Sequence, residues 1–261
     1  VIVFFAVSIL SSIAGSICGI GGGVIIKPVL DATGIMSVSA ISFLSGCTVL
    51  AMSVVSVYKN VRSKAAKLDL RIATGLAVGA AVGGVLGKTM FQSLKEAVGN
   101  EAVVGMTQAL VLIAVTLGTL IYTVYKQRIR TKTYTQIWLC VVIGILLGVM
   151  SSFLGIGGGP INLVVLAYFF SMSTKEAALS SLYIIMFSQI TSLIQTCATG
   201  SIPKVSAAYL AAMVVGGILG GTLGSKVNKK ISEEGVNKLF IALMAVIIGI
   251  NIYNAVKFGM A

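Results

Sequence analysis

Long stretches without a charged residue are the feature that most constrains this chain. No Asp, Glu, Lys or Arg occurs from Ile72 to Gly87 or from Trp138 to Ser173. A helix needs about 20 mainly apolar residues to cross about 30 Å of hydrocarbon, and such stretches can supply them. Only 10% of the 261 residues are charged, whereas a soluble domain carries roughly 25%. The sequence therefore predicts an all-α, polytopic membrane protein.

The net charge of +12 does not indicate a nucleic-acid partner. The Lys and Arg residues lie in short segments beside apolar runs, which is typical of the cytoplasmic loops of membrane proteins. Histidine is absent, and four cysteines lie far apart inside apolar runs: Cys18, Cys47, Cys140 and Cys197. We therefore expect buried thiols, no metal and no cofactor. The stretch from Val1 lacks a basic start and a cleavage site, so we expect it to be part of the fold.

The apolar runs form a series of five that occurs twice. They cover residues 1–17, 24–30, 36–58, 70–93 and 102–125, and then 136–153, 160–171, 176–197, 205–227 and 236–257. The glycine-rich sequence at 19–23 recurs at 155–159, an offset of 136. The same offset places Met36-Ser37 on Met172-Ser173. We therefore predict two repeats, 1–125 and 136–261, joined by a basic cytoplasmic linker at 126–135.

The distribution of Lys and Arg predicts that the two repeats have opposite orientations. If each repeat makes an odd net crossing, the 59–71 loop, the linker, Lys175 and the basic residues of 226–238 share one side. The other side then holds only Lys88, Lys95, Lys204 and Lys257. Parallel repeats give a weaker bias, and cytoplasmic loops are enriched in Lys and Arg. Since three spans per repeat already make an odd crossing, each glycine-interrupted segment must be a hairpin that returns to its starting side.

Two other sets of glycines recur every four residues. They are Gly75, Gly79, Gly83 and Gly87, and later Gly216, Gly220 and Gly224. Small residues at this spacing let helices approach closely in lipid, so we expect helix–helix contacts. The stretch from Gly83 to Thr89 ends in Gly-Lys-Thr, as a nucleotide-binding loop does, but it has three intervening residues where that loop has four. No strand precedes it either, so we expect no nucleotide site.

The two glycine-rich breaks are candidate anion-binding loops. Their glycines are Gly19, Gly21, Gly22 and Gly23, and Gly155, Gly157, Gly158 and Gly159. Irregular backbone inside a membrane must be covered by protein or line a cavity. A half-helix after each break, with Pro160 in the first turn of the second, would present free N–H groups and a partial positive charge. Two such ends in inverted repeats would converge on one small anion. The alternative is that these glycines only permit close helix contacts.

Lys27 follows the first break by one turn and is a further candidate for anion binding. It either contacts the anion or forms a structural pair with Asp31, four residues later. The second repeat has Leu163 and Ala167 at the matching positions, with Asn162 as a neutral polar neighbour. Charge is therefore expected to differ between the two halves of the site.

Three more polar residues complete the candidate site. Ser45 and Ser181 occupy equivalent positions early in their spans. Their hydroxyls either donate to the anion or bond to their own helices. Gln189 lies centrally in its span and is a further candidate for substrate binding.

At these residues the sequence resembles the TauE/SafE family of membrane anion transporters. The resemblance is carried by the break at 19–23 followed by Pro28, by its recurrence at 155–160, and by small-residue segments at 40–45 and 177–181. Val164 stands where the first repeat has Pro28. The resemblance implies export of sulfite, thiosulfate or small organosulfur anions across the prokaryotic cytoplasmic membrane.

The absence of an ATP-binding motif leaves a gradient, or the membrane potential itself, to drive such a transporter. An inside-negative potential favours anion efflux. An anion channel that uses the same glycine loops as a selectivity filter is the alternative. We expect no enzyme, because the chain has no histidine and no central pair of carboxylates. The expected partners are the small anion and membrane lipid, and a homo-oligomer stays open.

Overall fold

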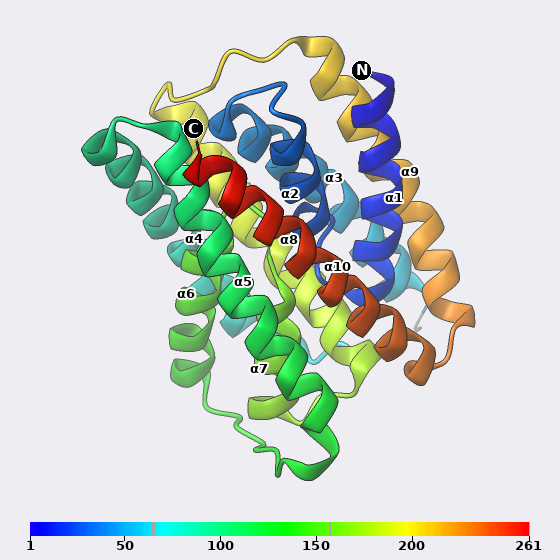
Figure 1. The fold of residues 1–261 in the computed structure, drawn as a ribbon. Coiled ribbons are helices and arrows are strands. Elements are labelled where there is room, and N and C mark those ends of the chain that lie inside the picture. Colours follow the sequence, from blue (N-terminus) through cyan, green and yellow to red (C-terminus); the bar gives the residue numbers. More distant parts are fainter. Residues whose placement is uncertain (64–65, 157, 261) are drawn as a thin grey trace.

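The described part of the chain consists of helices and their connections (Figure 1). A computed structural model describes residues 1–63, 66–156 and 158–260. Its helices are α1 (Ile2–Cys18), α2 (Gly23–Thr33), α3 (Val38–Arg62), α4 (Leu70–Val98), α5 (Glu101–Tyr125), the short 3-10 helix η1 (Lys126–Arg128), α6 (Ile137–Phe153), α7 (Pro160–Phe170), α8 (Thr174–Ala198), α9 (Ala207–Lys230) and α10 (Glu233–Gly259). Six of them, α3, α4, α5, α8, α9 and α10, are long and apolar enough to cross a membrane. The prediction of an all-α polytopic membrane protein is confirmed.

Two short helices follow the glycine-rich breaks directly. α2 and α7 have 11 residues each, which is about 16 Å at 1.5 Å per residue and too short to cross a membrane. α2 begins at Gly23, and α7 begins at Pro160 in the first helical turn. Proline suits that position because its missing N–H is one that the first turn leaves unbonded in any case. The predicted half-helices are therefore confirmed.

The bundle has two ends, which differ in the segments they carry. At the end that we call the terminus end, Lys257 of α10 donates to the carbonyl of Ala32 at the close of α2, at 2.9 Å. Both chain termini lie at this end (Figure 1). The opposite end carries the basic linker, and we call it the basic end. There the Lys126 ammonium donates to the side-chain oxygen of Asn237 in α10 at 2.9 Å. Because α1 starts and α2 finishes at the terminus end, this helix pair has the hairpin form expected from the sequence.

The four-residue glycine series form close helix pairs across the two predicted repeats. In α4, a Cβ at Gly83 would collide with the backbone of Ile145 in α6. In α9, a Cβ at Gly220 would meet Ser12 of α1 at 2.5 Å and the Ile9 carbonyl oxygen at 2.6 Å. Only glycine lets these backbones approach so closely, as small-residue motifs do in membranes. The predicted helix–helix contacts are confirmed.

These helix pairs are reciprocal. α1 lies along α9, while α6, the counterpart of α1 in the second half, lies along α4. Gly19 packs against Ala178, and Gly155 packs against Ser42; both pairs are related by the offset of 136. Reciprocal contacts of this kind are what a two-fold relation between the halves produces. The repeat boundaries and the opposite orientation of the repeats stay predictions.

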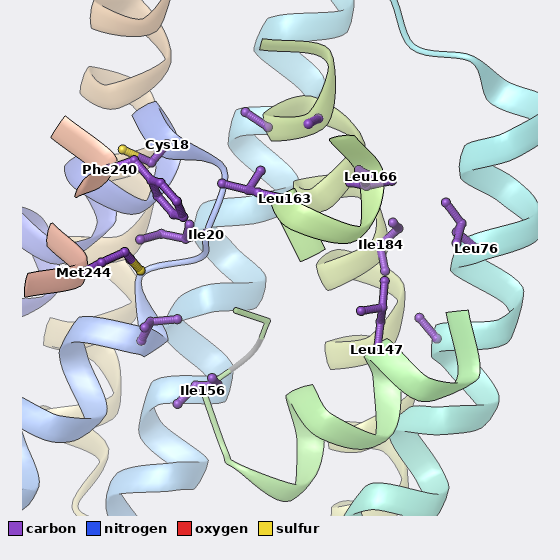
Figure 2. Packing of buried hydrophobic residues seen from close by; sticks show 14 of the residues in the cluster. Cys18, Ile20, Leu76, Leu147, Ile156, Leu163, Leu166, Ile184, Phe240 and Met244 are labelled. Atoms are coloured by element: carbon purple, nitrogen blue, oxygen red, sulfur yellow. The ribbon is translucent and has the colours of Figure 1, made fainter. Parts of the chain in front are cut away.

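A buried apolar cluster surrounds the first break. Ile20, in the middle of the break, is fully buried and points toward Phe240 and Met244 of α10 (Figure 2). Leu163 of α7 belongs to the same cluster, and so does Ile156 of the second break. The apolar residues between the glycines therefore anchor both irregular segments in the interior.

Three of the four cysteines are buried or partly buried, as expected, and the fourth is exposed. Cys18 and Cys140 are buried and Cys47 is partly buried, but Cys197 is exposed near the end of α8. The expectation of a buried thiol is wrong for Cys197, because it lies in the last turn of α8, where residues 197–201 are all exposed.

Candidate functional site at the glycine breaks

Both breaks contain backbone that favours glycine. In the first break, φ is 76° at Gly19 and 74° at Gly21. In the second, φ is 64° at Gly155 and 123° at Gly158. A side chain at such positive φ values is strained, whereas glycine adopts them freely. Gly157 lies outside the described residues.

The N-terminus of α2 faces the second break. A Cβ at Gly23 would collide with the carbonyl oxygen of Ile156 and would lie 2.9 Å from the Ser45 hydroxyl. The amides of Gly23 and Val24 donate no hydrogen bond to any described residue. Free N–H groups and a partial positive charge are therefore concentrated at this point, where the two breaks meet.

Buried hydroxyls without partners surround this helix end. The Ser45 side chain is fully buried, and its hydroxyl bonds to no described residue. The Ser12 hydroxyl is likewise unpartnered, and it would lie 3.2 Å from a Cβ at Gly22. Because an unsatisfied buried hydroxyl costs free energy, such groups in a native fold call for a ligand or a bound water. Gly22 itself has an ordinary helical backbone, with φ of −64°.

The second half-helix brings together a different pair of candidate residues. Gly159 caps α7 in an extended conformation. One turn later, the side-chain amide of Asn162 donates to the Ser181 hydroxyl at 3.3 Å. The side-chain oxygen of Asn162 is buried without a partner among the described residues. Gly158 packs against the Ile185 side chain of α8.

Lys27 forms an ion pair inside the protein. Its ammonium lies 2.5 Å from an Asp31 carboxylate oxygen, and the two side chains are only 4% and 6% exposed. The second Asp31 oxygen has no hydrogen-bond partner among the described residues. The Lys27 side chain also approaches the second break, since its Cε atom lies 3.5 Å from a Cβ placed at Gly155. The geometry favours the structural pair over direct anion contact.

Gln189 reaches the second break through a small polar cavity. Its side-chain oxygen lies 3.0 Å from a Cβ built at Gly46, so that glycine leaves room for the amide. Gln189, Ser42 and Gly155 line this cavity together with Lys88 of α4. Sequence reasoning treated Lys88 only as a charge in the orientation count and as part of a failed nucleotide motif. Its position inside an apolar run, without an acidic neighbour, was the signal available.

A larger cavity of about 290 Å³ lies at the basic end between α5, α7, α8 and α10. Cys18, the last residue before the first break, lines it together with Leu163 of α7. Lys126 is also part of its wall. Burial lowers the pKa of Lys126, and the nearby Glu233 carboxylate partly offsets that effect. The cavity therefore connects the basic end with the neighbourhood of the first break.

The arrangement defines a class of protein: a multi-pass membrane protein in which two broken helices bring irregular, glycine-rich backbone into the interior. The sequence matches the family model described as sulfite exporter TauE/SafE over residues 4–252. The chain belongs to the TauE/SafE family, which places it among membrane transporters in the prokaryotic cell membrane. No curated protein and no solved structure matched the chain.

Proposed function

We propose that the protein is a secondary transporter that exports a small anion, either sulfite, thiosulfate or an organosulfur anion. The anion is held at the glycine breaks, beside the N-termini of α2 and α7. One observation carries the proposal: the unbonded amides of Gly23 and Val24 lie next to the unpartnered Ser45 hydroxyl where the breaks meet. Helix N-termini with free N–H groups are favourable sites for anions, and broken helices bind substrates in this way in other transporters.

The two halves contribute unequal groups to the proposed site. The first supplies Gly19, Gly21, Gly22 and Gly23 with Ser45, and the second supplies Gly155, Gly158 and Gly159 with Asn162 and Ser181. Asn162 and Ser181 already bond to each other at 3.3 Å, so they are positioned to donate to a ligand together. We assign Lys27 a structural role, because the Asp31 carboxylate neutralises its charge.

Alternating access would follow from a change in the contact between the two breaks. The Ile156 backbone lies against Gly23 in this conformation, so the N-terminus of α2 is covered. Movement of the second break would uncover it toward one end of the bundle at a time. The reciprocal contacts of the two halves support inverted repeats. In such repeats the two halves can exchange conformations, so that the site opens first to one side of the membrane and then to the other.

The membrane potential is a source of free energy for export. An inside-negative potential favours efflux by about 2.3 kcal/mol per charge per 100 mV. The intramembrane proton relays of many pumps use Asp, Glu or His, but His is absent from the chain and the Asp31 carboxylate is engaged with Lys27. We therefore propose transport driven by the potential, without a coupled proton.

The test uses the full chain in proteoliposomes loaded with radiolabelled sulfite, with the potential set by a potassium gradient and valinomycin. We expect saturable efflux that rises with the potential and shows counterflow when unlabelled sulfite is added to the other side. Flux that does not saturate and shows no counterflow would favour the channel alternative. Efflux that ignores the potential and stops when a proton gradient is collapsed would refute the proposed drive.

A further inference from the structure

Lys88 is a lysine inside a membrane-spanning helix that forms no ion pair with any described carboxylate. α4 continues beyond Lys88 to Val98, which is about 15 Å at 1.5 Å per residue. The charge of Lys88 therefore lies about three turns before the end of the helix. The ammonium lies 5.4 Å from the centre of the Phe91 ring, which is a cation–π distance. Ionisable residues at such depth are rare and mark substrate pathways. Lys27 is neutralised by Asp31, whereas the charge of Lys88 is not balanced.

Lys88 lines a cavity whose other polar groups are uncharged. Gly155 of the second break and Gln189 of α8 share its wall, and the hydroxyl side chains in the wall are those of Ser42, Ser152, Ser192 and Thr196. Among the described residues, no Asp or Glu lines the cavity. Ser42 is 8% exposed, and its hydroxyl has no partner among the described residues. One cation surrounded by amide and hydroxyl donors is the environment that an oxyanion needs when it leaves water.

We propose that Lys88, Gln189, Ser42 and Ser192 form a second oxyanion-binding site, between the second break and the terminus end. This inference rests on the proposed function, and it names a station on the path of the same anion. The cavity holds about 20 Å³ in this conformation, which is room for roughly one water. An oxyanion needs more room than this and enters when the wall formed by Gly155 moves, as alternating access requires.

The matching position in the other half lacks the charge. The offset of 137 that relates Gly83 to Gly220 places Ser225 opposite Lys88. The Ser225 hydroxyl lies 3.2 Å from the Ser16 hydroxyl, which in turn lies 2.8 Å from the Ser56 hydroxyl. These serines satisfy one another, whereas Ser42 is left without a partner. The equivalent cavity in the other half is lined by Ser16 and has a lysine at a different position, Lys175. The combination of a lysine with an unpartnered serine hydroxyl, that of Ser42, therefore belongs to the Lys88 cavity.

The first test is anion binding by the full chain purified in detergent. The melting temperature is followed against sodium sulfite, thiosulfate and sulfate at constant ionic strength, balanced with chloride. A ligand that binds the native state raises the melting temperature. We expect at least one oxyanion to stabilise the wild type and Lys88→Arg with similar midpoint concentrations. Lys88→Met should raise that midpoint by about tenfold, because it removes a charged hydrogen bond. Lys204→Met, in the loop before α9, is the matched control and should leave the midpoint unchanged.

The outcomes separate a binding role from a structural one. A structural lysine changes the melting temperature without anion but leaves the midpoint concentration alone, and that result overturns the inference. So does the absence of stabilisation of the wild type by all three oxyanions. If Lys88→Met does not fold, Gln189→Leu and Ser192→Ala must raise the midpoint, and unchanged midpoints in both overturn it. Binding that depends on Lys88 without transport in proteoliposomes refutes the proposed function and leaves this site standing.

Discussion

The side-chain amide of Asn228 in α9 donates a 2.6 Å hydrogen bond to the backbone carbonyl of Ile17, in the last turn of α1. Carbonyls in the last turn of a helix have no partner within the helix. The second half has the same arrangement from another helix: Gln108 of α5 donates at 2.7 Å to the carbonyl of Phe153, 136 positions after Ile17. Each helix that leads into a break is therefore closed by a carboxamide donor.

Replacing Asn228 with leucine should destabilise the protein. The substitution leaves the buried Ile17 carbonyl without a donor, which costs about 1–3 kcal/mol. We expect the melting temperature in detergent to fall by several degrees. Glu234→Gln is the control, because the ion pair that it breaks with Lys238 is exposed to solvent, and surface pairs contribute little to stability. Equal melting temperatures for Asn228→Leu and the wild type would show that the hydrogen bond does not hold the end of α1.

Enlarging a glycine in the α1–α9 contact should separate these helices. A Cβ at Gly220 would lie 2.5 Å from the Ser12 Cβ, so Gly220→Val must push the two backbones apart. Overpacking of this kind costs about 1–3 kcal/mol. Gly249→Val in α10 is the matched control, because no atom lies within 4 Å of a Cβ there. The measurement is the monomer peak in fluorescence-detected size-exclusion chromatography after heating; similar losses for both variants would contradict the close-contact role.

Most of the fold could be predicted because lipid restricts backbone so strongly. Apolar runs without charge must be helices in a membrane, and the expected runs agree with the helices to within a few residues at most ends. The start of α7 at Pro160 was also predictable, since proline fixes a first-turn position. The reciprocal pairing of α1 with α9 was only partly accessible: four-residue glycine spacing indicates a close contact but does not name the partner helix.

The site was less accessible, because its contacts join residues far apart in the chain. Nothing local links Asn228 to Ile17 or Gly155 to Ser42. The same holds for Lys88, whose importance depends on the position of Gln189 on a different helix and on the lack of a carboxylate partner among the described residues. The pairing of Lys27 with Asp31 was accessible, because four residues on one helix place two side chains side by side.

Replacing Gly158 with alanine should strongly reduce transport without unfolding the protein. φ is 123° at this residue, and a Cβ would collide with the Ile185 side chain, so the break must change shape at the N-terminus of α7. We expect sulfite efflux from proteoliposomes to fall at least about tenfold at similar insertion into the membrane. Gly200→Ala is the control, because Gly200 has φ of 63° in a loop but no atom within 4 Å of its Cβ position. Full transport by Gly158→Ala would reduce the second break to a structural turn.

Removing one partner of the Lys27–Asp31 pair should be far more harmful than removing both. Asp31→Asn leaves a buried ammonium without its counter-charge, and breaking a buried pair in this way costs about 3–5 kcal/mol. The double variant Lys27→Met/Asp31→Leu replaces both charges with apolar groups, so we expect its melting temperature to return close to that of the wild type. Because we assign Lys27 a structural role, the double variant should also retain saturable sulfite efflux. Recovery of stability without recovery of transport, measured on the same protein preparation, would instead show that Lys27 contacts the anion during the transport cycle.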